Sequence, residues 1–114
     1  MDMEAACKNF DIAEYYVSSF LCQQAVEKAL KAYLISKTGE LIKVHDLPYL
    51  CRKAGIPDNI ASLCDRLNTI YIDTRYPDMS GDIPSKKFTK QITEENLADA
   101  KEVLRWLQNK LLKK

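Results

Sequence analysis

Cationic side chains that could bind phosphate stand at several separate places in the sequence. Lys28 and Lys31 lie on one polar face of the helix expected over QQAVEKALKAYL, at about 100° of rotation per residue. Arg75 and Tyr76 follow at the end of another helix, where a guanidinium could hold a phosphate bidentately while the phenol ring stacks on a base. A histidine opens a short helix, and a basic cluster with an aromatic ring comes later. These positions predict a nucleotide-binding site made by Lys28, Lys31, His45, Arg75, Tyr76, Lys86, Lys87 and Phe88.

Each of these positions also has a purely structural interpretation. Glu27 and Lys31 form an i,i+4 pair that supports a helix, so the polar face could be a solvated, self-paired surface. Arg75 could pair with Asp73 or Asp78 at its own helix end. His45 could make a local hydrogen bond at the start of its helix. The sequence leaves both interpretations open.

The usual catalytic and metal-binding signatures are absent from the sequence. It has no glycine-rich phosphate loop, no H-E-x-x-H, no serine nucleophile elbow and no carboxylate pair at a characteristic spacing. Its four cysteines form no C-x-x-C pair, and His45 is the single histidine, so no zinc site and no cofactor are expected. Cys22 and Cys64 fall on predicted core faces, where a free thiol acts as a small hydrophobe. We therefore assign no catalytic residue and no metal ligand.

Length and composition indicate one globular domain over residues 1–114. With 46% hydrophobic residues and three glycines, the chain can fill a single core and favours helices. The net charge of +1 gives no overall attraction to nucleic acid or to an acidic membrane, so such binding needs a local patch. No stretch approaches the ~20 apolar residues that cross a bilayer, and the start, MDMEAACKNF, is unlike a signal peptide. A cytoplasmic protein with no membrane partner is expected.

The hydrophobic pattern predicts an all-α fold, an up-and-down bundle of four to five helices. The first two helices are expected over residues 2–8 and 12–37, and Gly39 ends the second. On that long helix, small residues at spacings of four and three form a stripe that another helix can approach closely. The stripe consists of Ser18, Cys22, Ala25, Ala29 and Ala32.

The second half of the chain continues the helical pattern. A short helix in HDLPYLCRKAG begins at the Asp46 cap and ends at Gly55. The next helix must stop near Arg75, because the following Tyr76 precedes a proline. A long connection over residues 77–92 leads to a final helix capped by Thr93. The inner seam of that helix is expected to be Leu97, Ala100, Leu104, Leu107 and Leu111.

Trp106 lies about 130° away from that seam, beside Val103. An outward-facing tryptophan needs a partner. It could cover a neighbouring part of its own chain or lie in a subunit interface, where tryptophan is enriched.

Three motifs in a fixed order carry a resemblance to a known family. QQAVEKALKAYL, HDLPYL and YIDTRYPD together resemble the HEPN domain family of higher eukaryotes and prokaryotes, over about residues 10–112. The resemblance implies a helical bundle, a homodimer, nucleotide binding and association with a minimal nucleotidyltransferase in a toxin–antitoxin pair. Many family members are metal-independent ribonucleases with an arginine followed closely by a histidine. Here His45 precedes the first arginine, Arg52, so that motif is absent.

The leading hypothesis is a nucleotide-binding or regulatory accessory domain, dimeric, that works with a minimal nucleotidyltransferase. In it, Lys28, Lys31 and Arg75 contact phosphate, Tyr76 or Phe88 stacks on a base, and residues 77–92 close over the nucleotide or RNA ligand. Two alternatives stay open. One is a ribonuclease toxin with a non-standard set such as His45, Arg75 and Tyr76; the other is a dimerising protein-interaction adaptor without nucleotide affinity.

Overall fold

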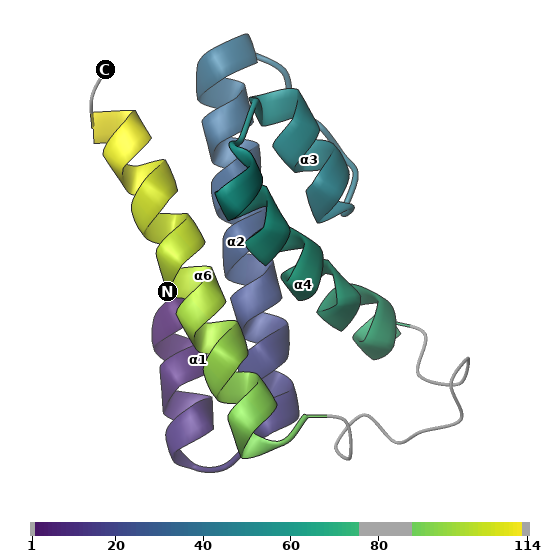
Figure 1. The fold of residues 1–114 in the computed structure, drawn as a ribbon, viewed down its shortest axis with the longest axis vertical. Helices are drawn as coiled ribbons and strands as arrows, with labels where there is room; N and C mark the ends of the chain where they lie inside the picture. The colour runs from purple at the N-terminus through teal and green to yellow at the C-terminus, as the bar shows by residue number, and fades with distance from the viewer. Residues whose placement is uncertain (1, 76–87, 113–114) are drawn as a thin grey trace.

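One long helix organises the molecule, and every other helix packs against it. The computed structural model describes residues 2–75 and 88–112, with the backbone alone at 71–75 and 112. Within these ranges the helices are α1 (Asp2–Asp11), α2 (Tyr15–Thr38), α3 (Leu47–Ala54), α4 (Asp58–Arg75) and α6 (Lys90–Leu112). α2 contacts all the others, and α1, α2, α4 and α6 alternate in direction along the chain, with the short α3 between α2 and α4 (Figure 1). The predicted all-α bundle is confirmed.

The core fills the space that α2 shares with α3, α4 and α6. Each fully buried leucine there contributes about 1.5–3 kcal/mol by removing apolar surface from water. The largest fully buried apolar side chains are Leu30, Leu34, Leu47, Leu50, Leu67, Leu107, Val26 and Val103. None of the helices in the described residues is both long and apolar enough to span a bilayer.

The ends of the middle helices follow the glycines and the cap that the sequence predicts. Gly39 ends α2 at φ +77°, and its N–H donates to the Ile35 carbonyl at 2.8 Å. Gly55 ends α3 at φ +68°. Both glycines occupy the left-handed region, which a side chain disfavours. Asp46 is the N-cap residue of α3, but its side chain makes no cap hydrogen bond.

The turn between α1 and α2 differs from the prediction. α1 extends to Asp11 instead of ending near residue 8, and α2 begins at Tyr15 instead of residue 12. Ala13 makes this turn at φ +63°, while the Glu14 N–H donates to the Asn9 carbonyl at 2.8 Å. A glycine usually occupies this position after a helix, so an alanine gives no sequence signal for it.

The start of α6 also differs, because Thr89 and not Thr93 caps the helix. The Ile92 N–H donates to Thr89 Oγ1 at 3.2 Å, and α6 begins at Lys90. Thr93 is fully buried instead, where its hydroxyl accepts a hydrogen bond from Ser19 Oγ at 3.0 Å. Asn96 Nδ2 donates to the same serine oxygen at 2.9 Å. These buried polar groups tie α6 to α2.

The small-residue stripe of α2 is buried over its first part alone. Ser18 and Cys22 are fully buried, but Ala25 and Ala29 are half-buried and Ala32 is exposed. A column spaced by four residues is buried instead, made by Ser19, Gln23 and Glu27. Of the polar face that the sequence presents as solvated, Glu27 is buried, whereas Lys28 is exposed.

The inner face of α6 is rotated slightly from the predicted seam. Val103 is fully buried, whereas Leu111 is 39% exposed. Trp106 is half-buried, and its ring packs edge-on against Tyr33 of α2 with centroids 6.1 Å apart. Trp106 therefore packs against its own chain, which was one of the two interpretations of this outward-facing tryptophan.

A two-pronged ion pair joins α4 to α6. Arg66 donates from Nε and Nη2 to the two carboxylate oxygens of Asp99, at 3.0 and 2.9 Å. These hydrogen bonds to Asp99 raise the pKa of the Arg66 guanidinium further. The Asp99 side chain is nearly buried, so this ion pair gives Arg66 a structural role between α4 and α6.

Candidate functional site

The two predicted cations of α2 contact different parts of the molecule. Lys28 Nζ lies 2.9 Å from Asp2 Oδ2 of α1, and the lysine side chain is 69% exposed. Lys31 Nζ lies 3.1 Å from Glu27 Oε2 on α2 itself and is 19% exposed. The prediction that both contact one phosphate stays a prediction, and in the described residues each lysine has a carboxylate of its own.

Lys31 belongs to a compact group of polar side chains, which we name the Glu27 cluster (Gln23, Glu27, Lys31 and His45). Glu27 Oε1 accepts a hydrogen bond from Gln23 Nε2 at 3.0 Å. Glu27 Oε2 accepts one from Lys31 Nζ at 3.1 Å and lies 2.7 Å from His45 Nδ1. One carboxylate therefore holds an amide, an ammonium and an imidazole in place.

The carboxylate at the centre of the cluster is buried and stays ionised. Glu27 is 5% exposed. Burial raises the pKa of its carboxyl, but hydrogen bonds from His45, Gln23 and Lys31 outweigh burial and leave this pKa below its ordinary value. Lys31 balances the carboxylate charge, so the cluster becomes positive whenever His45 is protonated. Since the His45 side chain is 48% exposed, that charge faces solvent.

The path of the chain before α3 brings the histidine to the carboxylate. After Gly39 ends α2, residues 40–46 carry the chain to α3, which packs on α2, and place His45 against Glu27, 18 positions earlier. The Leu47 N–H then donates to Asn68 Oδ1 of α4 at 3.1 Å, which fixes the start of α3. The cluster is thus anchored to α2 and, through α3, to α4.

The remaining predicted site residues divide into two groups. Arg75 is the last residue of α4, and the structure describes its backbone but not its side chain. Tyr76, Lys86 and Lys87 lie outside the described residues. Phe88 is described and is 5% exposed. Its ring packs edge-on against Tyr16 with centroids 5.7 Å apart, so it belongs to the core and offers no open face to a base.

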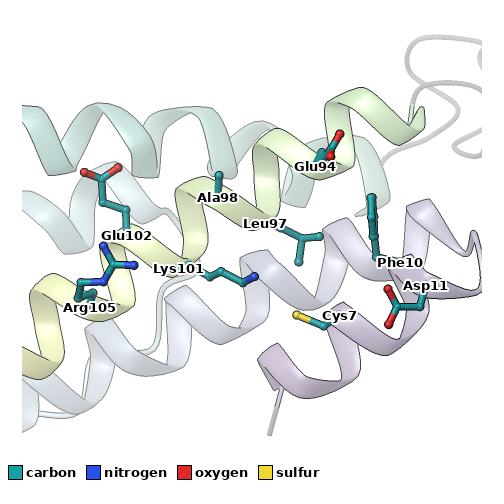
Figure 2. Close-up of a pocket in the computed structure, with 9 residues that line it drawn as sticks. All are labelled: Cys7, Phe10, Asp11, Glu94, Leu97, Ala98, Lys101, Glu102 and Arg105. Atoms are coloured by element: carbon teal, nitrogen blue, oxygen red, sulfur yellow. The ribbon is translucent and has the colours of Figure 1, made fainter.

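A groove of about 750 Å³ runs between α1 and α6, away from the Glu27 cluster. Figure 2 shows Phe10 and Leu97 in the groove and the Lys101 side chain extending toward Cys7. Asp11 and Glu94 lie near one end, and Arg105 and Glu102 near the other. The lining residues are Cys7, Phe10, Asp11, Glu94, Leu97, Ala98, Lys101, Glu102 and Arg105.

Leu97 lies between the two ends of the groove and Phe10 lies beside Asp11, so the groove presents apolar surface next to charges of both signs (Figure 2). Its volume is in the range of ordinary ligand pockets. Sequence reasoning missed it, since α1 and α6 are far apart in the chain. A partial signal exists: Glu94, Lys101 and Arg105 recur on one face of the final helix, outside its seam.

Metal-ligating side chains do not cluster in the described residues. No group of three or more His, Cys, Asp or Glu side chains in residues 2–75 and 88–112 could hold a metal ion. The chemical groups that the two candidate sites present are carboxylates, ammonium and guanidinium groups, one imidazole and one half-buried thiol.

Comparisons with known proteins agree with the fold and with the three sequence motifs. The HEPN domain model matches residues 1–111. The crystal structure of TT1696 from Thermus thermophilus superposes with a TM-score of 0.85 at 26% identity, covering 96% of this chain and 89% of that one. ST0689, described as an archaeal HEPN homologue, gives 0.80 at 27% identity, covering 96% and 88%. No curated protein sequence matches significantly. The chain therefore belongs to the HEPN domain family, a family of nucleotide-binding and RNase-type domains.

Proposed function

We propose that the protein is a nucleotide-binding accessory domain that works, as a dimer, with a minimal nucleotidyltransferase in a toxin–antitoxin pair. The observation that carries the proposal is the Glu27 cluster. There, Lys31 and His45 are both held within about 3 Å of a single buried carboxylate oxygen. A purely structural ion pair needs one cation for one carboxylate, whereas this carboxylate holds two cation-forming groups, of which His45 is about half exposed.

The cluster is suited to receive a phosphate. An ammonium has three N–H donors, and Lys31 uses one of them on Glu27. A protonated His45 adds a second positive charge, and the buried carboxylate keeps both side chains ordered, which lowers the entropy lost on binding. Arg75 and Tyr76, at the end of α4, extend the proposed site with a bidentate donor and a ring for the base. Lys28, Lys86 and Lys87 are proposed as outer cations.

Calorimetric titration of the full chain with ATP and GTP tests this proposal. Lys31→Gln and His45→Gln should each weaken binding by about tenfold, as expected for loss of one charge-assisted contact. Lys53→Gln, which removes an equal charge from an exposed position at the end of α3, is the matched control and should leave affinity unchanged. Absence of binding heat at millimolar nucleotide would reject nucleotide binding itself.

The groove between α1 and α6 provides the competing location for the nucleotide. Lys101→Gln and Arg105→Gln remove the two cations of the groove, both of which are exposed. If these variants weaken binding while Lys31→Gln does not, the phosphate binds between α1 and α6 and the site assignment is wrong. The proposed site requires the opposite result.

The partnership needs separate measurements. Light scattering on the purified chain should give twice the 13.1 kDa protomer mass. Co-expression with a short nucleotidyltransferase encoded beside this gene should yield a complex that survives gel filtration. Two separate elution peaks would reject the partnership, and a complex without nucleotide affinity would favour the protein-interaction adaptor.

A ribonuclease is the second candidate, and the Glu27–His45 contact is the observation that favours it. A carboxylate 2.7 Å from Nδ1 fixes the orientation of an imidazole, as in histidines that act as general acid and base. The half-exposed ring can meet a substrate. Incubation with RNA should then show cleavage that His45→Ala abolishes and Glu27→Gln reduces. Intact RNA after incubation with the wild-type protein would eliminate this candidate.

A further inference from the structure

The edge of α6 that borders the groove carries a charge pattern that fits a second copy of the same helix. It consists of Glu94, Ala98, Lys101 and Arg105, at spacings of four, three and four, and all four are exposed. At about 100° per residue they lie within about 60° of one another around the helix. The spacing reads the same from either end, whereas the charge changes from negative to positive. Two antiparallel copies of α6 can therefore place Glu94 of each opposite Arg105 of the other.

α1 adds to the charge difference along the groove. Asp11 lies near Glu94 at one end, and Arg105 and Glu102 lie near the other (Figure 2). The first end thus carries two negative charges. The other end carries the cations Lys101 and Arg105 against the single carboxylate of Glu102, a net charge of one positive.

These charges and the apolar surface beside them have no partner within the described parts of their own copy. Asp11, Glu94 and Arg105 form no ion pair within residues 2–75 and 88–112. Phe10 is half-buried and lines the groove. Ile12, directly after Asp11, is 70% exposed, the largest value among the exposed large hydrophobic side chains that the structure describes.

The mixed charge selects the kind of partner. Asp11 and Glu94 would repel a polyanion such as RNA, and Lys101 and Arg105 would repel a strongly basic surface. In a contact with twofold symmetry, residue i of one copy meets residue j of the other, and j meets i. A second copy therefore presents the cationic end to the acidic end and satisfies both ends at once.

We propose that the α1–α6 groove is the surface through which two copies of this chain associate. The twofold axis passes midway between Glu94 and Arg105 along α6, so the same ion pair forms twice. Ala98 lies near that axis, where its small side chain allows the two helices to approach closely. The proposal rests on the dimer of the proposed function and assigns its surface. The Glu27 cluster lies outside this surface, so each copy keeps its own site.

Charge reversal tests the proposed contact. Glu94→Arg and Arg105→Glu each turn both symmetry-related pairs into like charges, and each should weaken self-association at least about tenfold. Light scattering over a concentration series should then show the mass falling from twice 13.1 kDa toward the protomer value. Glu40→Arg and Lys53→Glu, at exposed positions outside the groove, are the matched controls and should leave the mass unchanged.

Mixing the two reversal variants tests the antiparallel arrangement itself. In a mixed dimer, each contact joins one arginine to one glutamate, so an equimolar mixture should regain the mass that both variants lose alone. Circular dichroism confirms that each variant is folded. Two folded variants that dissociate but do not recover on mixing would overturn the proposed pairing.

Cross-linking tests the surface without any substitution. A carbodiimide joins a carboxylate to an amine with loss of water, and copies labelled with ¹⁴N and ¹⁵N distinguish links between copies from links within one. Mass spectrometry should find Lys101 of one copy joined to Asp11 or Glu94 of the other. Absence of these mixed-label peptides from a protein that is dimeric by light scattering would overturn the proposal.

The outcomes separate this surface from the rest of the proposed function. A wild-type dimer whose mass is unchanged by both reversals has its interface elsewhere, which rejects the groove and retains the dimer. A wild-type protein that stays a monomer over the whole concentration series rejects both. Titration with ATP is independent: no binding heat, together with the expected masses, would reject nucleotide binding and support the interface.

Discussion

The Glu27 cluster and the α1–α6 groove both carry charged residues, but they are held in shape by different forces. In the cluster, three donors converge on one buried carboxylate at 2.7–3.1 Å. In the groove, the charged side chains are exposed, and the walls are the packed helices α1 and α6. The turn at Ala13 joins α1 to the central α2.

This difference separates two ways of building a polar site. The cluster is defined by side-chain hydrogen bonds, so one substitution should disorder it and cost stability. The groove is defined by backbone position, so its charged residues can be exchanged with little effect on folding. Three sets of variants test this contrast: at the central carboxylate, at the Ala13 turn and at the cations of the groove.

Removal of the central carboxylate should cost the most. Glu27→Gln loses the charge that holds Lys31 and His45, and should lower the free energy of unfolding by about 2 kcal/mol, in the range for hydrogen bonds to charged groups. Glu102→Gln, the same change in the groove, should stay within about 0.5 kcal/mol of wild type. Urea unfolding at pH 7 gives both values. Equal losses of unfolding free energy in the two variants would show that the cluster and the groove are held in shape in the same way.

The pH dependence of that loss follows from the lowered pKa of Glu27. A carboxyl with a lower pKa in the folded state stabilises the protein fully above its unfolded pKa, about 4.3 for glutamate. This contribution disappears as pH falls through the lower folded pKa. The stability difference between wild type and Glu27→Gln should therefore be fully present at about pH 5 and shrink as the pH falls further. A difference that keeps growing below about pH 4 would contradict the ionised carboxylate.

The turn at the end of the groove should respond to backbone chemistry and not to charge. Ala13→Gly removes the side chain from a left-handed position and should stabilise the protein by about 1 kcal/mol. Ala32→Gly, at an exposed position within α2, is the matched control and should destabilise by about 1 kcal/mol. Thermal unfolding of both variants measures the two signs. A destabilising Ala13→Gly would show that the alanine methyl makes a needed contact.

The charges of the groove should matter least to folding. Lys101→Ala and Arg105→Ala each remove an exposed cation, and each should change the free energy of unfolding by less than about 0.5 kcal/mol. The apparent melting temperature in low salt is a sufficient measurement. A loss comparable with that of Glu27→Gln would mean that the groove is also held together by ion pairs.

Local sequence signals predicted the helices wherever backbone chemistry decides a boundary. Gly39 and Gly55 mark two ends because a positive φ suits glycine, and the proline after Tyr76 indicates the end of α4 at Arg75. The turn at Ala13 was missed because its left-handed residue is not a glycine. Thr93 was misread as a cap because a threonine before two glutamates looks the same whether it is exposed or buried.

The candidate site was predictable in its residue types but not in its arrangement. Lys31 and His45 were both named from the sequence, yet Glu27 was assigned to a solvated stripe. Its burial depends on the segment after Gly39, which covers one side of α2 and delivers His45 from 18 positions away. No single-helix pattern contains that information. Phe88 was named for stacking, but it packs on Tyr16 inside the core.

The four-residue spacing of Ser19, Gln23 and Glu27 along the buried side of α2 has a consequence for how the bundle assembles. If α2 slid lengthwise by one turn, about 5.4 Å, the bulky amide of Gln23 would enter the narrow space that the Ser19 hydroxyl fills beside Thr93 and Asn96. The increase in side-chain size along this column therefore allows only one lengthwise position of α2 in the bundle.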